Sequence, residues 1–408
     1  MRHSIVPPAS PLPILITDGL EEADIRMQIE LKVQSPLHIG SGEEITHEEL
    51  LFEGHTAYVP DITGYFRDHP DEIDPFVNGI DQGQPPSLFF EDISRYSRYA
   101  IEPWVDERTV GRSPIKTVMK TAGDEPYLPG SSIKGALRMA LAHRALDGGR
   151  GLDDFTGWAV ERLFRPEQDD PKGDLLKCVT VRDSKPADPD DSLVLGEIKT
   201  YSLNTEGEMR AKRWSNFAEL LRPGTRLTTE VSVDVELLNR MVETHSARRK
   251  AEAILGGDLT EQGVLERITE ALREFGQATV DEERQLTGDF DDIEEFYRGF
   301  DDQPRLRIGF GTSYYSNTVA TALSEAERIS IQTDNRLGRG PFHDDCGGNL
   351  GPDRHNSGKL FCHRCTTGGL DPHSNEGILR FPKTRRFVLR DGSPEYPLRW
   401  VDMIPPSF

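Results

Sequence analysis

Apolar and polar residues alternate along several stretches of this chain, and elsewhere apolar residues recur at helical spacing. From Ile25 to Val33 every second residue is apolar, the pattern of a strand with one buried face. Apolar residues three or four positions apart predict helices at 133–146, 247–275 and 318–326. Further strands are predicted at 56–59, 176–181, 195–203, 226–237, 305–308 and 379–389. Helices and strands mix without regular βαβ alternation, so an α+β fold is expected.

The segments between these elements suggest how the chain is divided. Residues 67–95 carry many Asp, Pro and Gly residues and are predicted to be irregular. Between 258 and 302 there are 15 acidic and four basic residues, so this helical segment has a strongly acidic surface. We therefore expect a loose N-terminal tail at 1–24, a core at 25–245, an acidic helical insertion at 246–303, and the rest of the core at 304–408 with an insertion at 340–370.

Composition and charge narrow the classes of protein. The 408 residues are 36% hydrophobic, which is enough for a substantial core. A mean hydropathy of −0.55, without a long apolar run or a signal peptide, predicts a cytoplasmic protein that does not cross a membrane. The net charge of −22 is unusual for a nucleic-acid-binding protein. However, residues 378–390 contain five basic residues and no acidic one, so a basic groove on an acidic protein is compatible with the sequence.

A cluster of cysteine and histidine residues near the C-terminus predicts a metal site. Two Cys/His pairs, each with two residues between its members, are separated by 15 residues, which is zinc-knuckle spacing. Four protein ligands leave no open position, so one structural zinc ion is expected. His355 and His363 are alternative ligands for the imidazole position, whereas Cys178 lies in an apolar strand and is expected in the core. The predicted ligands are His343, Cys346, Cys362 and Cys365.

The helix predicted at 133–146 begins with residues that suit a phosphate group. Ser131 or Ser132 is expected to cap the helix, whose first backbone amides favour an anion. Lys134 and Arg138 lie one turn apart and are expected to be exposed on one face, where they could add phosphate contacts. An ordinary well-capped helix accounts for the same residues.

Two glycine-rich turns follow predicted strands, and such turns offer backbone amides to phosphates without needing net positive charge. His38 precedes the first turn and could act as a general base, although a lone histidine there is more often structural. The basic strand near the C-terminus could flank the same groove. The candidate residues are His38, Gly40, Ser41 and Gly42; Gly309, Phe310 and Gly311; and Lys383, Arg385 and Arg386.

Together these motifs resemble the RAMP superfamily of CRISPR effector proteins. Residues 35–42 look like its N-terminal signature, residues 127–138 are similar to its central one, and residues 307–311 resemble its C-terminal glycine-rich loop. The ending, at 381–386 and 397–401, narrows the resemblance to the fifth-subunit family of the type III-A Csm effector complex. The resemblance implies a ferredoxin-like core, related to RNA-recognition domains. The cysteine cluster departs from the family's general pattern, so the zinc-binding segment, like the acidic helical one, is expected to be an insertion in this core.

The resemblance also implies a function. A protein of this kind would be a non-catalytic subunit that binds CRISPR RNA near its 3′ end, caps a filament of backbone subunits, and supports guide maturation in antiviral defence with host trimming nucleases as further partners. The slicing relatives carry a Gly-Ile-Asp-type stretch that residues 42–61 lack, which argues against target cleavage. The alternative is a metal-independent RNA endonuclease that processes precursor CRISPR RNA, with His38 and Lys134 as its base and cation.

Overall fold

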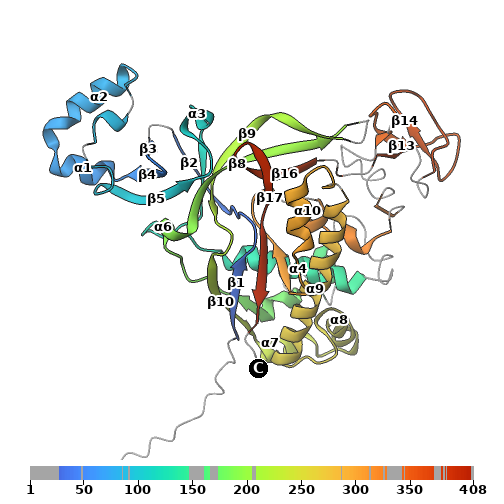
Figure 1. The fold of residues 1–408 in the computed structure, drawn as a ribbon. Coiled ribbons are helices and arrows are strands. Elements are labelled where there is room, and N and C mark those ends of the chain that lie inside the picture. The colour runs from blue at the N-terminus through green and yellow to red at the C-terminus, as the bar shows by residue number, and fades with distance from the viewer. Residues whose placement is uncertain are drawn as a thin grey trace, which may run out of the picture.

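A computed structural model represents the chain and describes residues 27–405, apart from 47–48, 85, 91, 147–159, 166–172, 205–207, 286, 312–313, 325–326, 329–341, 344, 372–377, 380–381 and 383. The described chain forms two large sheets with helices packed beside them, and two sheets of only two strands each. A small lobe projects at each end of the molecule (Figure 1). The fold is therefore of the α+β class, as the sequence predicts. The N-terminal tail lies outside the described residues.

The smaller sheet has five strands and carries the alternating segment at its centre. Its order is β11 (Arg305–Arg307), β18 (Trp400–Ile404), β1 (Met27–Val33), β10 (Arg226–Val233) and β7 (Val179–Val181), and all pairs are antiparallel. The apolar residues of β1 are buried and the residues between them are not. The alternation therefore predicted both the strand and its buried face.

Two long helices cover this sheet and bury its apolar residues. α4 (Gly130–Leu146) and α9 (Glu261–Arg284) pack against each other and against strands of the five-stranded sheet. α9 belongs to the segment expected as an acidic insertion, yet its Val264, Ile268 and Leu272 join the main hydrophobic core. Shorter helices complete this layer, namely α7 (Val235–Met241), α8 (His245–Leu255) and α10 (Asp291–Arg298).

The larger sheet has nine strands and is mixed and curled. Its main path is β2 (Gly40–Ile45), β6 (Ile115–Val118), β9 (Met209–Leu221), β8 (Leu193–Leu203), β5 (Ser97–Pro103), β4 (Thr56–Pro60) and β3 (Leu51–Glu53). β16 (Thr384–Arg390) pairs with β8, and β17 (Ser393–Pro397) pairs with β16. β8 and β9 form a long hairpin across the top of the molecule (Figure 1). β9 was not predicted from the sequence, because its first half is almost entirely exposed and does not alternate.

The projecting lobes lie at opposite ends of the molecule (Figure 1). One contains α1 (Ile62–Asp68), α2 (Ile73–Asp81) and the 3₁₀ turns at Pro70–Glu72 and Pro86–Leu88. The other contains β13 (Leu350–Pro352) and β14 (Leu360–Cys362), close to β12 (Phe342–His343) and β15 (Ile378–Leu379). The remaining elements are α3 (Glu107–Val110), α5 (Val160–Leu163), α6 (Pro189–Ser192), α11 (Tyr314–Asn317) and 3₁₀ turns at Leu175–Cys178 and Ala320–Ala322.

Three local predictions were wrong. Residues 67–95 are irregular only in part, because α2 and two 3₁₀ turns lie within them, and a cluster of aromatic side chains holds α1 and α2 together. The strand predicted at 226–237 ends at Val233, because Asp234 caps α7. The helix predicted at 318–326 is replaced by α11 and a 3₁₀ turn, with residues 325–326 outside the described part.

Candidate metal centre and nucleic-acid interface

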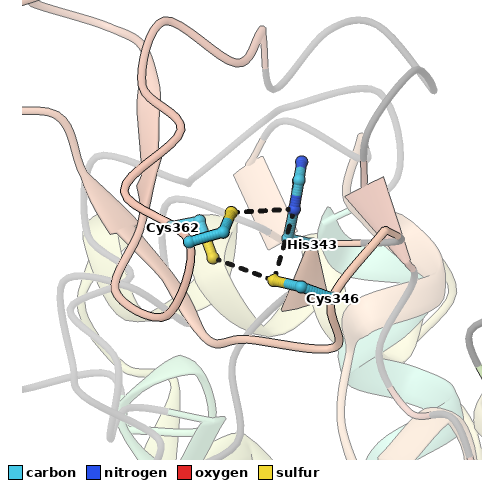
Figure 2. A group of neighbouring side chains, drawn as sticks. His343, Cys346 and Cys362 are labelled. Atoms are coloured by element: carbon cyan, nitrogen blue, oxygen red, sulfur yellow. Dashed lines mark hydrogen bonds between the residues drawn. The ribbon is translucent and has the colours of Figure 1, made fainter.

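The four residues predicted as metal ligands converge on one point. Their ligand atoms all lie within 4.8 Å of one another. The Nδ1 atom of His343 is 3.4 Å from the Cys346 sulfur and 3.3 Å from the Cys365 sulfur, and the Cys346 and Cys362 sulfurs are 3.5 Å apart. Figure 2 shows His343, Cys346 and Cys362 pointing toward one another. Ligands of a tetrahedral zinc ion are separated by roughly 3.5–3.8 Å, so the spacing and donor set fit zinc.

Neighbouring groups hold these four side chains in place. The Asp345 carboxylate lies 3.7 Å from His343 Nε2, the ring nitrogen that does not face the sulfurs. A side chain at Gly348 would come within 2.7 Å of the Cys362 sulfur, so the tight turn needs glycine there. A hydrogen bond with the Thr367 hydroxyl lowers the pKa of Cys365 to about 6, which favours the thiolate that a metal would bind.

The two alternative histidines are not at the cluster. His363 packs against Phe361 and approaches Gly351, while the His355 amide donates a hydrogen bond to Asp353. His343 is therefore the imidazole that the fold brings to the cysteines. Cys178 is buried in the main core, as expected, where burial raises the pKa of its thiol to about 12.

The two glycine-rich turns, at 40–42 and 309–311, lie far apart in the sequence but meet in the structure. The Phe310 amide donates a hydrogen bond to the His38 carbonyl at 2.7 Å, and the His38 and Phe310 rings make an edge contact at 5.7 Å. Gly309 has a φ of +94°, and a Cβ there would lie 2.3 Å from the His38 carbonyl oxygen. Glycine is required at this contact, because any side chain would separate the turns.

Adjacent arginines of β16 face opposite sides of the sheet. Arg386 is half-buried, lies over the Phe310 ring at 5.5 Å and approaches Gly311, and among the described residues it has no carboxylate partner. Arg385 is buried, and its Nε lies 2.7 Å from Glu283. The prediction that both contribute to an open basic groove is wrong for Arg385, because strand alternation turns it into the core. Lys383 lies outside the described residues.

Positive charge accumulates beneath the Gly309–Gly311 turn. Glu283 on α9 pairs with Arg307 at 2.6 Å and with Arg385, so both of its oxygens are used. Arg399 is fully buried and donates from Nη1 to the Gly309 carbonyl at 3.3 Å, but its Nε and Nη2 have no hydrogen-bond partner among the described atoms. Burial lowers the pKa of Arg399 well below its ordinary value, because the charged form lacks compensation.

The start of α4 differs from the sequence prediction. The helix begins at Gly130, whose amide donates to the Asp183 carboxylate at 2.7 Å, so neither serine is the cap. Lys134 Nζ donates to the Val179 carbonyl at 2.7 Å, and Arg138 pairs with Asp174 at 2.8 Å. The expectation that both cations are exposed is therefore wrong. They fasten α4 to the segment around β7, while Ser131 is exposed and Ser132 is half-buried.

His38 occupies a buried polar network. Its Nδ1 lies 2.8 Å from the Glu219 carbonyl, and it is only 2% exposed. Burial lowers the pKa of His38 below its ordinary 6.5, so the ring is neutral at pH 7. The Glu219 carboxylate is itself buried between Tyr99, Lys120 and the Val118 amide. These contacts favour a structural role for His38 over the alternative role as a general base. His38 contacts Glu219 of β9 in the nine-stranded sheet, whereas Lys134 contacts Val179 of β7 in the five-stranded sheet.

The β8–β9 hairpin presents candidates that the sequence reasoning missed. Trp214 is 73% exposed, the highest value among the large hydrophobic residues described. Lys212 and Arg213 beside it are exposed and have no acidic partner among the described residues. The run Lys-Arg-Trp at 212–214 was the available signal. Ser41 and Gly42 lie at the edge strand β2, where the Ser41 hydroxyl is 2.6 Å from that of Thr117.

Comparison with known proteins identifies the family to which this chain belongs. Residues 30–313 match the RAMP superfamily, and the chain belongs to that superfamily. Within it, the chain is a Csm5-like protein. It is 24% identical to the CRISPR system protein Csm5 of Streptococcus thermophilus over 252 residues, which are 55% of this chain and 68% of that protein. It is 23% identical to Csm5 of Mycobacterium tuberculosis over 347 residues, 74% of this chain and 85% of that protein.

Solved structures share the fold. A chain of the cryo-EM structure of a Csm–crRNA–target RNA ternary complex from a type III-A CRISPR–Cas system superposes with a TM-score of 0.64 and 22% identity, over 92% of this chain and 100% of that chain. The crystal structure of T. onnurineus Csm5 gives a TM-score of 0.56 and 21% identity, over 91% and 99%. Among the described residues, no helix is both long and apolar enough to span a membrane.

Proposed function

We propose that this protein is a non-catalytic, CRISPR RNA-binding subunit of a type III-A effector complex, acting in the cytoplasm. It would bind the 3′ end of the guide, cap the filament of backbone subunits, and support assembly and guide maturation. The observation that carries the proposal is the junction of the two glycine-rich turns with Arg386, a cation without a carboxylate partner among the described residues. Membership of the RAMP superfamily supports the same assignment.

The RNA face is proposed to centre on this junction. Its backbone amides and the charge of Arg386 favour phosphates, and Phe310 offers a ring on which a base could stack. Such a site binds RNA although the chain carries a net charge of −22, because phosphate affinity depends on local charge. Its members are Gly40, Ser41, Gly42, Gly309, Phe310, Gly311 and Arg386, whereas Ser131, Ser132 and Lys383 stay predictions.

The hairpin would extend this face along the RNA. Trp214 provides an exposed ring, and Lys212 and Arg213 provide charges for the flanking phosphates. Stacking of a base on an aromatic side chain contributes about 1–3 kcal/mol and tolerates any base. This is the recognition expected of a subunit that must accept every guide sequence.

We infer that the protein does not cleave RNA. An endonuclease would need a base and a cation at one 2′-hydroxyl. His38 is buried against Glu219, and the Lys134 amine is engaged by Val179. Trimming of the guide is therefore proposed to be the work of host nucleases. RNA cleavage by purified protein that a point substitution abolishes would contradict this inference.

We also propose that His343, Cys346, Cys362 and Cys365 hold one structural zinc ion. The donor set and spacing support it, and four protein ligands leave no position for a substrate. The five-stranded sheet is proposed as the ferredoxin-like core. Strands β18, β1, β10 and β7, in that order and joined through α4 and α9, support this assignment.

One experiment tests the function. The protein is purified alone and together with the other subunits of its effector complex, and bound RNA is extracted, sized and sequenced. We expect CRISPR RNA of defined length, and crosslinks from Phe310 or Trp214 to its 3′ part. Crosslinks only to the 5′ end of a guide of the same length would refute the proposal that this protein binds the 3′ end. Absence of CRISPR RNA from the assembled complex would refute the function.

A further inference from the structure

The α1–α2 lobe carries an apolar patch that the protein itself does not cover. Among the described residues only four large hydrophobic side chains are exposed, and Ile73, Val77 and Leu88 of this lobe are three of them. Ile73 and Val77 are one helical turn apart on α2 and therefore share a face. They are 41% and 50% exposed, although the lobe buries an aromatic cluster of its own around Tyr65.

The patch has an acidic rim. Residues 61–90 contain six acidic residues and a single lysine or arginine, Arg67. Asp74 and Asp81 lie three and four positions from Val77, so they border it on the helix surface. Both are exposed, and neither has an ion-pair partner among the described residues.

A groove begins where α2 ends. A cavity of about 680 Å³ lies between the lobe and α3, with Ile80, Pro86 and Val110 among its apolar lining and Arg108 and Arg112 on its far side. The patch and the groove together offer a bound partner both an apolar surface and a recess. Contiguous apolar surface with a charged border is typical of protein interaction sites.

We propose that this lobe is a docking surface for a neighbouring protein subunit, one whose contact surface has apolar side chains surrounded by lysine and arginine. The acidic border selects this occupant. Beside Ile73 and Val77, Asp74 and Asp81 would repel RNA phosphates and anionic lipids, whereas Arg108 and Arg112 lie across the groove from them. A second copy would bring the same carboxylates and the same net charge of −22 against this patch. The proposal rests on the proposed function only in taking the partner from the effector complex.

The lobe also lies away from the proposed RNA face. It is at the end of the molecule opposite the metal-site lobe, beyond β3 and β4, whereas the glycine-rich turns contact β16 and β9 (Figure 1). Protein contacts and RNA contacts are therefore separable by substitution.

The test uses the full chain with Ile73→Gln and Val77→Gln together. Glutamine keeps helix propensity, and both sites are exposed, so the thermal midpoint should not change. Binding is measured to the purified protein subunits of the same effector without RNA, and separately to guide RNA alone. We expect a loss of about tenfold or more in affinity for one protein subunit and unchanged affinity for RNA.

Charge variants distinguish the contribution of the acidic rim to binding from that of the apolar patch. Asp74→Asn with Asp81→Asn should slow association with that subunit and make it less sensitive to salt. Glu236→Gln with Glu243→Gln, which removes two exposed acids on another surface, is the matched control and should have no effect.

Wild-type affinity of the Ile73/Val77 variant for every protein subunit would overturn the proposal. So would a dimer of the wild-type protein that this variant dissociates, or a loss of RNA binding alone. If the wild-type chain binds no RNA but the patch variant loses its protein partner, the function fails and the docking surface stands.

Discussion

Arg385 and Arg386 provide a paired test of how this protein divides its basic residues between stability and RNA binding. They are neighbours on β16 and point to opposite sides of the sheet. Arg385 is 3% exposed, and its Nε lies 2.7 Å from Glu283, which also binds Arg307. Arg386 lies over Phe310 with no acidic partner among the described residues. The two Arg→Met substitutions remove the same charge from adjacent positions, so each is the control for the other.

The structure gives different magnitudes for the two variants. Breaking a buried ion pair costs about 3–5 kcal/mol, and because Glu283 keeps Arg307 we expect Arg385→Met to lower the free energy of unfolding by about 2–4 kcal/mol. Arg386→Met removes no ion pair and should change it by under about 1 kcal/mol. A charge-assisted phosphate contact is worth about 1.5–3 kcal/mol, so Arg386→Met should weaken RNA binding roughly ten- to a hundredfold.

Two measurements check this, namely thermal unfolding and titration of labelled guide RNA at several salt concentrations. Arg386→Met should leave the thermal midpoint unchanged and reduce the dependence of log affinity on log salt by about one unit, because one phosphate contact is lost. Arg385→Met should lower the midpoint and leave the affinity of the folded fraction intact. The reasoning is refuted if Arg386→Met destabilises the fold as much as Arg385→Met, or if it leaves RNA affinity unchanged.

Further predictions concern the metal site, the hairpin, His38 and α4. The wild-type chain should bind about one equivalent of zinc by elemental analysis, and Cys362→Ser with Cys365→Ser should lose it while the core stays folded. Cys178→Ala is the control and should retain the metal. Trp214→Ala should weaken RNA binding by about 1–3 kcal/mol regardless of base sequence, and Trp214→Phe should restore most of it. Because the pKa of His38 is lowered on folding, the unfolded state binds the extra proton below pH 6.5, so unfolding free energy should fall as pH drops below that value. His38→Asn should make this dependence shallower, and an unchanged pH profile would contradict the buried neutral ring. Replacing Lys134 and Arg138 by Ala should lower the free energy of unfolding by more than it lowers the free energy of RNA binding. A larger loss in RNA binding than in unfolding would show that the two cations contact RNA.

The sequence by itself determined the features that depend on local spacing. Alternation in residues 27–33 predicted β1 and its buried face, and the apolar spacing after Gly130 predicted α4. The cysteine and histidine pairs predicted four residues that the fold brings within 4.8 Å. In each case neighbouring residues in the chain decide the outcome, because strand and helix periods and tight turns are local properties.

Only the tertiary structure decided what each charged and glycine residue contacts. Nothing near Arg385 in the sequence distinguishes it from Arg386, because its partner Glu283 lies about a hundred residues away on α9. Lys134 likewise found a carbonyl of β7 in place of a phosphate. The meeting of the turns at His38 and Gly309 depends on strand order in two sheets. Pairings between distant segments are set by how the whole core packs, and that information is spread over the chain and absent from any single motif.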